Sequence, residues 1–423
     1  MSAMRFPKMV KIKQHFTGPV VEDIDRTVAE QLAAVGLADQ VKAGMRVAIT
    51  AGSRGIANIH VIVRAVVREL KRYGAEPFIV PTMGSHGGAT AEGQVEVLES
   101  LGITEAFCGA PILSSMEVVQ IGETPGGMPV HLDKHAWEAD GIVLMGRIKV
   151  HTDFKSALHI ESGLLKMAAI GLGKHKQALL LHGHGLHGIR DIMPDVGRVV
   201  LEKAKVLCGV GIIENAFEQT AKIEAIPTKQ IPEREPILLR ESAELMPKLP
   251  VEEIDILHVG EIGKNYSGTG MDTNIIGRLR IHEAQEPASP QIRYIIASDL
   301  SEASHGNALG IGLADLTTQR LFDKIDFKSM NENVITSTFL LRAAIPIVLP
   351  NDREALTVAL RANWGIEPDQ AKIVRIPNTL HLEYLYVSEA LLPIVAELPH
   401  VEVLGEPEEF SFDEAGYLPK MHV

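Results

Sequence analysis

Residues 45–73 read MRVAITAGSRGIANIHVIVRAVVRELKRY, and this stretch decides the fold. Its first six residues form a short apolar run that predicts a β-strand, and a glycine-containing loop follows it. Residues 58–73 then place Ile62, Val66 and Leu70 on one face at helical spacing. A strand, a loop and an amphipathic helix in this order predict a βα unit of a parallel sheet.

The same pattern continues along the chain. Residues 76–81 predict a second strand, which a loop at 83–89 and a helix at 90–101 follow. Further strands are expected at 117–121, 129–132, 141–145, 206–213, 254–259, 291–297, 345–349 and 371–376. Because these runs alternate with stretches of helical spacing, the sequence favours an α/β fold with mostly parallel sheets.

The length and one proline-rich segment predict two domains. A chain of 423 residues exceeds the size at which a single hydrophobic core stops growing. Residues 226–250 hold five prolines and many charges, which is typical of a junction. We therefore expect an N-terminal domain at 1–230, a linker at 231–250 and a C-terminal α/β domain at 251–423, with a cleft between the two domains.

Composition excludes several classes of protein. The formal net charge is −13 and the basic residues are dispersed, which argues against a nucleic-acid partner. No apolar run is long enough for a membrane span or a secretory signal, so we expect no membrane partner. The two cysteines, Cys108 and Cys208, lack metal-type spacing, and a reducing cytoplasm fits them best.

Two loops that follow predicted strands carry candidate functional residues. In open α/β sheets such loops line the crevice where ligands bind. The first loop contains Ser53 and Arg54, and the arginine could bind a carboxylate or a phosphate through a bidentate contact. The second contains His86 between glycines, a setting that offers little to bury it. An imidazole suits proton transfer near neutral pH, so His86 is a candidate acid–base residue.

A third stretch, residues 146–188, is rich in histidine and lysine. Its histidines are His151, His159, His175, His182, His184 and His187. This density favours a metal site, since neutral imidazole is the commonest metal ligand in proteins, although a solvated helix face would look similar. A non-enzymatic nickel-binding protein that uses residues 182–187 is therefore one alternative.

The same stretch supports a second alternative. Residues 183–188, GHGLHG, fit the pattern GxGxxG, with Glu214 at the distance expected of a ribose ligand. If residues 178–181 formed a strand, the chain could be a nicotinamide (NAD)-dependent 2-hydroxy acid dehydrogenase. Two of the variable positions are histidines and the strand would be very short, which weakens this interpretation.

Taken in order, the three loops resemble the nickel-dependent lactate racemase family of 2-hydroxy acid racemases and epimerases. Ser53-Arg54 resembles the Thr-Arg core of its first loop, and Gly84-Ser-His86 resembles its glycine–histidine loop. His151 matches the second catalytic histidine, and Lys166, before small and apolar residues, matches the cofactor lysine. His182 follows Lys166 by sixteen residues, the spacing of the family's nickel histidine. Lys155 and Lys174 are the alternative lysines.

The resemblance implies a chemistry and a set of roles. It implies an isomerase that racemises a lactate-like 2-hydroxy acid by hydride transfer through a 2-keto acid. The cofactor would be a nickel-pincer nucleotide, a pyridinium bisthiocarboxylic acid mononucleotide joined to Lys166, with nickel on His182. His86 and His151 would be the catalytic acid–base pair. Ser53 and Arg54 would contact the cofactor.

The resemblance also implies partners and substrate contacts. Arg54, Lys264, Asn274 and Arg278 are the candidates for substrate binding. The partners would be the small-molecule hydroxy acid and the cofactor-biosynthesis enzymes needed for maturation. The sequence leaves open which hydroxy acid is used and whether the chain forms a homo-oligomer.

Overall fold

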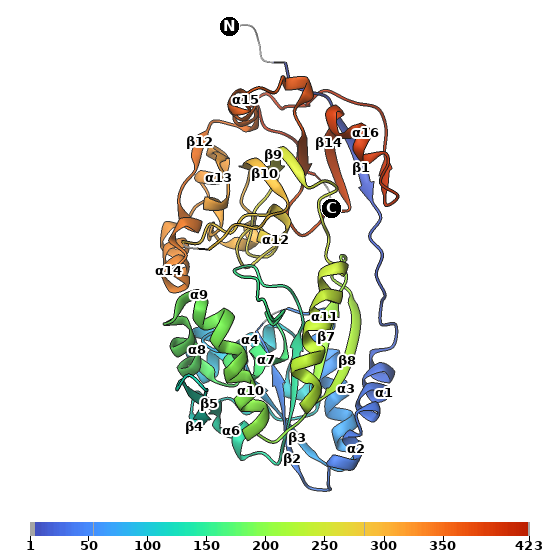
Figure 1. The fold of residues 1–423 in the computed structure, drawn as a ribbon, viewed down its shortest axis with the longest axis vertical. Helices are drawn as coiled ribbons and strands as arrows, with labels where there is room; N and C mark the ends of the chain where they lie inside the picture. The colour runs from blue at the N-terminus through green and yellow to red at the C-terminus, as the bar shows by residue number, and fades with distance from the viewer. Residues whose placement is uncertain (1–4, 54, 283, 422–423) are drawn as a thin grey trace. The chain divides into compact units, whose positions relative to one another are not determined.

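The computed structural model describes residues 5–53, 55–282 and 284–421, and it divides into two compact units (Figure 1). We name them for their places in the chain. The central unit is Thr17–Met246, and the terminal unit joins Met1–Phe16 to Pro247–Val423. Both units combine sheets with helices, so the predicted α/β class is confirmed. Among the described residues, no helix is long and apolar enough to cross a membrane.

The central unit is built on a five-stranded sheet with the order β3-β2-β6-β7-β8. Its strands are β2 (Arg46–Ala51), β3 (Glu76–Pro81), β6 (Gly141–Arg147), β7 (Val206–Glu214) and β8 (Thr220–Pro227). The first four run parallel, and β8 pairs antiparallel with β7. The chain passes from β2 to β3 on one side and later adds β6 on the other side of β2. Ligands of open α/β sheets bind at such a reversal of strand order.

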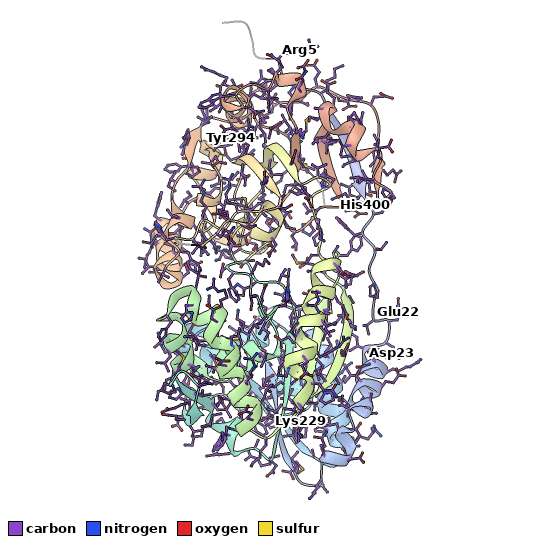
Figure 2. All side chains as sticks on the ribbon, in the orientation of Figure 1. Arg5, Glu22, Asp23, Lys229, Tyr294 and His400 are labelled. Atoms are coloured by element: carbon purple, nitrogen blue, oxygen red, sulfur yellow. The ribbon has the colours of Figure 1, made fainter. Side chains whose placement is uncertain are left out.

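Helices cover this sheet with the apolar faces that the sequence predicted. Helix α3 (Ile59–Arg72) buries Ile62, Val66 and Leu70 completely, together with residues of α1 (Ile24–Ala34). Asp23, labelled in Figure 2, caps α1 by accepting a hydrogen bond from the Arg26 amide. The other elements of this unit are α2 (Leu37–Gln40), α4 (Ala91–Ser100), α5 (Glu105–Cys108), β4 (Val118–Glu123), β5 (Pro129–Asp133), α6 (Lys134–Glu138), α7 (Leu164–Lys166), α8 (Lys174–His182), α9 (Gly185–His187), α10 (Met193–Lys203) and α11 (Ile231–Leu245).

The terminal unit contains an eight-stranded mixed sheet with the order β12-β11-β10-β9-β13-β14-β1-β15. Its strands are β1 (Met9–Gln14), β9 (Glu253–Val259), β10 (Gln291–Ala297), β11 (Leu316–Thr318), β12 (Ile347–Leu349), β13 (Ile373–Ile376), β14 (Tyr384–Ser388) and β15 (Val401–Val403). Strands β9 to β13 run parallel, whereas β14, β1 and β15 pair antiparallel. The helices are α12 (Thr273–Ile276), α13 (Gln319–Phe322), α14 (Phe327–Ser337), α15 (Asp352–Ala362) and α16 (Leu392–Val395).

The division of the chain differs from the predicted one at two places. Residues 231–250 were expected to form a linker, but most of them form helix α11, which packs in the core of the central unit through Ile231, Leu238 and Leu239. The first residues were assigned to the N-terminal domain, but strand β1 lies in the sheet of the terminal unit. The structure therefore differs from the prediction in the boundaries of the two units and agrees with it in their α/β class.

Candidate functional site

Three loops that leave the carboxyl ends of β2, β3 and β6 carry the candidate residues of the central unit. Ser53 follows β2 and His86 follows β3, and the Ser53 Oγ lies 2.8 Å from the His86 Nδ1. This hydrogen bond joins the first two loops and orients the imidazole. Arg54, the neighbour of Ser53, lies outside the described residues.

The loop that carries His86 is stabilised by the buried side-chain amide of Gln94. The side-chain nitrogen of Gln94, on α4, donates to the carbonyl oxygens of Gly84 at 3.0 Å and His86 at 3.2 Å. Its oxygen accepts a hydrogen bond from Lys174 Nζ at 3.0 Å. Lys174 also donates to the carbonyl of Pro81, where β3 ends. One lysine and one glutamine thus fix both ends of the segment before His86.

Lys174 is paired with a buried acid. Its Nζ lies 3.3 Å from Asp133 Oδ2 at the end of β5, and both side chains are fully buried. Burial raises the pKa of Asp133 and lowers the pKa of Lys174, although their mutual attraction opposes both shifts. Since every hydrogen bond of Lys174 is made inside the protein core, this lysine supports the loop and is a poor choice for the cofactor lysine.

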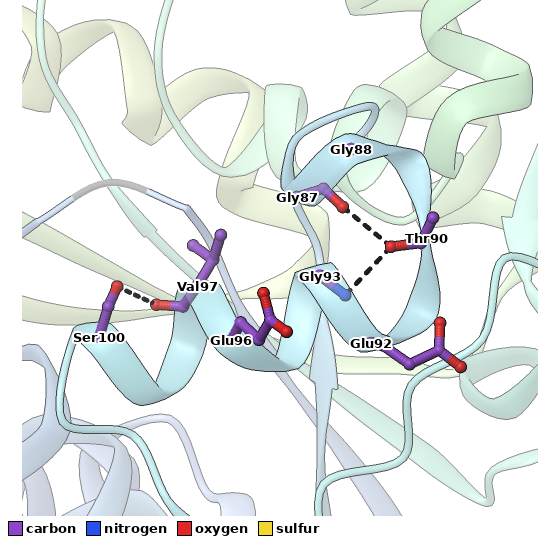
Figure 3. A pocket seen from close by; sticks show the side chains of 8 residues that line it. All are labelled: Gly87, Gly88, Thr90, Glu92, Gly93, Glu96, Val97 and Ser100. Atoms are coloured by element: carbon purple, nitrogen blue, oxygen red, sulfur yellow. Dashed lines mark hydrogen bonds between the residues drawn. The ribbon is translucent and has the colours of Figure 1, made fainter. Parts of the chain in front are cut away.

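A shallow groove lies beside the same loop (Figure 3). It is lined by Gly87, Gly88, Thr90, Glu92, Gly93, Glu96, Val97 and Ser100. Thr90 caps α4 there by accepting from the Gly93 amide. The carboxylates of Glu92 and Glu96 would repel an anionic substrate, so this groove does not suit a hydroxy acid.

His151, in the loop after β6, contacts the predicted cofactor lysine directly. The Nζ of Lys166 lies 2.8 Å from the Nε2 of His151. The amide of Asp153 donates to the Nδ1 of the same ring at 3.1 Å, and Phe154 stacks on the ring with centroids 4.5 Å apart. Buried Glu161 accepts from the His151 amide at 2.6 Å. Three contacts therefore fix the imidazole, and Glu161 fixes the backbone of the same residue.

Lys166 lies where one helix type changes into another. Residues 164–166 form α7, and Met167–Gly171 continue as a π-helix before α8 begins. Single π-turns of this kind are frequent at functional sites. Gly52, in the loop after β2, lies close to the side chain of Met167. A Cβ built on Gly52 would be 3.4 Å from that side chain, which is van der Waals contact. The helix of Lys166 thus packs against the first loop.

His182, at the end of α8, belongs to the same neighbourhood. Burial lowers its pKa, and the positive charge of Lys166 lowers it further, while Asp153 opposes the shift. The structure thus favours a neutral imidazole, which is the form that binds a metal. No group of three histidine, cysteine, aspartate or glutamate side chains gathers as a metal site within the described ranges.

The helix that bears Lys166 begins against a buried carboxyl from a distant part of the chain. Glu235, on α11, accepts a hydrogen bond from the Leu165 amide at 2.9 Å through Oε2. The residue is only 1% exposed. Burial raises its pKa to about 7. Sequence reasoning missed Glu235 because it lies in the segment predicted to be a linker.

The substrate residues predicted in the terminal unit have partners inside that unit. Lys264 Nζ donates to the Gly268 carbonyl and to Asn333 Oδ1, both at 2.6 Å. Asn274 donates to Asp272 at 2.9 Å. Arg278 forms an ion pair with Asp315 at 2.7 Å, and it also donates to three backbone carbonyls, so its guanidinium stabilises the fold.

The dinucleotide motif does not have the structural context that it needs. Residues 178–181 lie in helix α8 and not in a strand, and the glycines at 183–188 connect α8 to further helices. Glu214 accepts from the Ala57 amide at 2.8 Å and pairs with Arg147 at 3.0 Å. No strand therefore leads into these glycines, and Glu214 supports the loop after β2.

The comparison with protein families bears on the same part of the chain. Residues 8–156 match the family model described as the lactate racemase N-terminal domain. Over these residues the chain is similar to the lactate racemase family. The matched range contains His86 and His151 and ends before Lys166 and His182. The family predicted from the three loops is thus confirmed.

A solved structure is similar in fold over most of this chain. The lactate racemase apoprotein from Thermoanaerobacterium thermosaccharolyticum shares 14% sequence identity with it and superposes with a TM-score of 0.53. The match covers 88% of this chain and 98% of that chain. At this identity the likeness concerns the fold alone. No curated protein matches the sequence.

Proposed function

We propose that the chain is an isomerase, a racemase or epimerase of a small, lactate-like 2-hydroxy acid. The observation that carries the proposal is the 2.8 Å contact between Lys166 and His151, together with the effect of the Lys166 charge on the pKa of His182. The similarity of residues 8–156 to the lactate racemase N-terminal domain supports it. An amine and two imidazoles from separate parts of residues 151–182 thus lie close together. A purely structural role would not require this combination.

The residues present fit the cofactor that the family implies. Lys166 offers a primary amine for a covalent link, and His182 offers a neutral imidazole for nickel. A single protein imidazole is enough where the organic part of the cofactor supplies the other metal ligands. When bound, such a cofactor would supply an acceptor for the hydride of the hydroxy acid. Ser53 and Arg54 are the residues we propose for further contacts with it.

Two histidines, His86 and His151, would move the hydroxyl proton. His86 and His151 come from loops after β3 and β6, the two strands that flank β2. We propose that one imidazole removes the proton of the substrate hydroxyl and that the other returns it to the opposite enantiomer by way of a planar 2-keto acid. Arg54 would bind the carboxylate as a bidentate partner. Lys264 and Asn274 stay candidates for the substrate, whereas the ion pair of Arg278 argues against it.

The direct test combines loading with activity. The protein is produced together with cofactor-biosynthesis enzymes and incubated with a panel of single-enantiomer 2-hydroxy acids, sugar acids included, and the products are separated on a chiral column. We expect isomer exchange for at least one acid and an added mass on the peptide that contains Lys166. Full activity without that added mass would refute the assignment of Lys166.

The same preparation separates the two alternatives. A dehydrogenase would change the absorbance of a nicotinamide cofactor in the presence of a hydroxy acid and would not depend on nickel. A nickel-storage protein would bind the metal through the histidines at 182–187 and would keep that affinity after Lys166→Ala. In the isomerase, Lys166→Ala should abolish both the adduct and the isomer exchange.

Ser53 provides a finer test of the site. Ser53→Ala removes the 2.8 Å contact that orients the His86 ring. We expect kcat to fall about two- to tenfold, the range of one hydrogen bond, with little change in KM. Steady-state kinetics in both directions of isomer exchange would measure it. A change confined to KM would instead mean that Ser53 binds the substrate.

A further inference from the structure

Glu235 bonds to the start of the helix that carries Lys166. Its Oε2 accepts from the Leu165 amide at 2.9 Å, and the Leu164 amide also bonds to the carboxyl. These two amides are the first of helix α7, where no carbonyl of the helix itself can satisfy them. A carboxylate at this place accepts hydrogen bonds from both amides, and its negative charge interacts favourably with the helix dipole. Lys166 is the next residue of the helix.

The contact leaves no space for a side chain before the helix. A Cβ built on Gly163 would lie 2.3 Å from the Oε1 of Glu235. The backbone of Gly163 is extended, with φ −175°, a conformation that any residue adopts. Glycine is therefore required at 163 by the carboxyl and not by the backbone. Glu235 and Gly163 form one matched pair.

The surroundings of this carboxyl are apolar. Leu164, whose amide bonds to the carboxyl, and Ile231, on the same helix as Glu235, are fully buried and lie near Gly209 of β7. The ionisable groups on the contacting elements have other partners: Lys166 contacts His151, and Arg234 pairs with Glu224 and Glu241. Glu233 is exposed on the first turn of α11. Within the described residues the Oε1 of Glu235 has no hydrogen-bond partner.

We propose that Glu235 is a positioning residue for Lys166, because its carboxyl fixes the first turn of the helix from which the lysine reaches His151. The proposal rests on the proposed role of Lys166 as the cofactor lysine. When the carboxyl is ionised it is a strong acceptor for both amides, and when it is protonated it is a weaker one. The hydrogen bonds from the two amides to the carboxyl should therefore become stronger as the pH rises through the pKa of Glu235, which is about 7.

Stability should show the opposite trend from the same group. Burial raises the pKa of Glu235 from 4.5 in the unfolded chain to about 7 in the folded one. Its contribution to the free energy of unfolding is therefore fully present below pH 4.5 and is lost as the pH rises through 7. Glu235→Gln should remove this part of the pH dependence.

The test follows the reactivity of Lys166 in the apoprotein, so that it does not depend on racemase activity. The protein is treated with a limiting amount of an amine-acetylating reagent between pH 6 and 8.5, and peptide mass spectrometry gives the rate for Lys166 relative to exposed Lys176 on α8. In the wild type we expect this ratio to fall as the pH rises through about 7, because the ionised carboxyl of Glu235 fixes the helix of Lys166 more firmly.

The variants separate positioning from folding. Glu235→Gln should give a ratio without the step near pH 7, and Glu235→Leu should raise the Lys166 rate about tenfold, as expected for a lost hydrogen bond to a charged acceptor. Gly163→Ala should raise the rate as well, because its Cβ displaces the carboxyl. Glu233→Gln is the matched control on the same helix and should behave as the wild type.

Two results would overturn the proposal. One is a step near pH 7 that persists in Glu235→Gln. The other is a Lys166 rate that stays at the wild-type value in both Glu235→Gln and Gly163→Ala at pH 8. If Glu235→Leu fails to fold, Glu235→Gln and Gly163→Ala still test the positioning role. If the acetylation results hold while the loaded protein shows no isomer exchange, the positioning role stands and the proposed function fails.

Discussion

Replacing His151 by alanine is expected to lower kcat for isomer exchange by about 10²–10⁴-fold, the range typical of a lost acid–base group. The ring is fixed by Lys166, by the Asp153 amide and by Phe154, so its removal leaves no nearby imidazole in the same position. Chiral chromatography of both enantiomers over time would measure the loss. Because each enantiomer would need both histidines in the proposed mechanism, both directions should slow together.

His86→Ala should give a loss of similar size, and His187→Ala should give none. His187 is an exposed histidine that pairs with Asp191 at 2.9 Å, and it belongs to the cluster that a nickel-storage protein would use. The thermal midpoint of each variant should stay close to that of the wild type. A His151→Ala protein that exchanges isomers at the wild-type rate would remove this histidine from the mechanism.

Lys174→Met is expected to lower the free energy of unfolding by about 3–5 kcal/mol, the cost of removing one partner of a buried ion pair. The substitution leaves Asp133 as an uncompensated acid in the core, and it also removes the hydrogen bonds to Pro81 and Gln94. Urea unfolding at neutral pH, followed by circular dichroism, would measure the change. Because the His86 loop loses its support, activity should fall as well.

A second substitution tests the reason for this loss. In Lys174→Met with Asp133→Leu the buried charge is gone, and we expect a large part of the lost stability to return. Activity should not return with it, because the amide of Gln94 still lacks the lysine that orients it. Equal stability of the single and the double variant would mean that the loss comes from packing and not from charge.

The βα units of the central unit could be predicted from local patterns. The strand expected at 76–81 is β3, and the helix expected at 58–73 is α3 within one residue at each end. Both depend on the spacing of apolar side chains within one short segment. The loops of Ser53, His86 and His151 follow strands that were predicted in the same way.

The contacts that hold the site could not be predicted in this way. Glu235 and Leu165 are 70 residues apart, and Lys174 and Pro81 are 93 residues apart. No periodicity links such pairs, since they meet only when the core is assembled. The prolines at 232 and 236 suggested an irregular segment, but the first lies at the start of α11, where its missing amide costs nothing. Arg54 stays a prediction, because it lies outside the described residues.

The place of strand β1 has a consequence for biosynthesis. Its neighbours in the sheet, β14 and β15, are encoded near the other end of the chain. On the ribosome β1 therefore emerges early and has to wait, with both backbone edges open, while the entire central unit is translated. Shielding by a chaperone during this interval would protect the nascent chain from aggregation. Deleting β1 should destabilise the eight-stranded sheet of the terminal unit and leave the five-stranded sheet of the central unit unaffected.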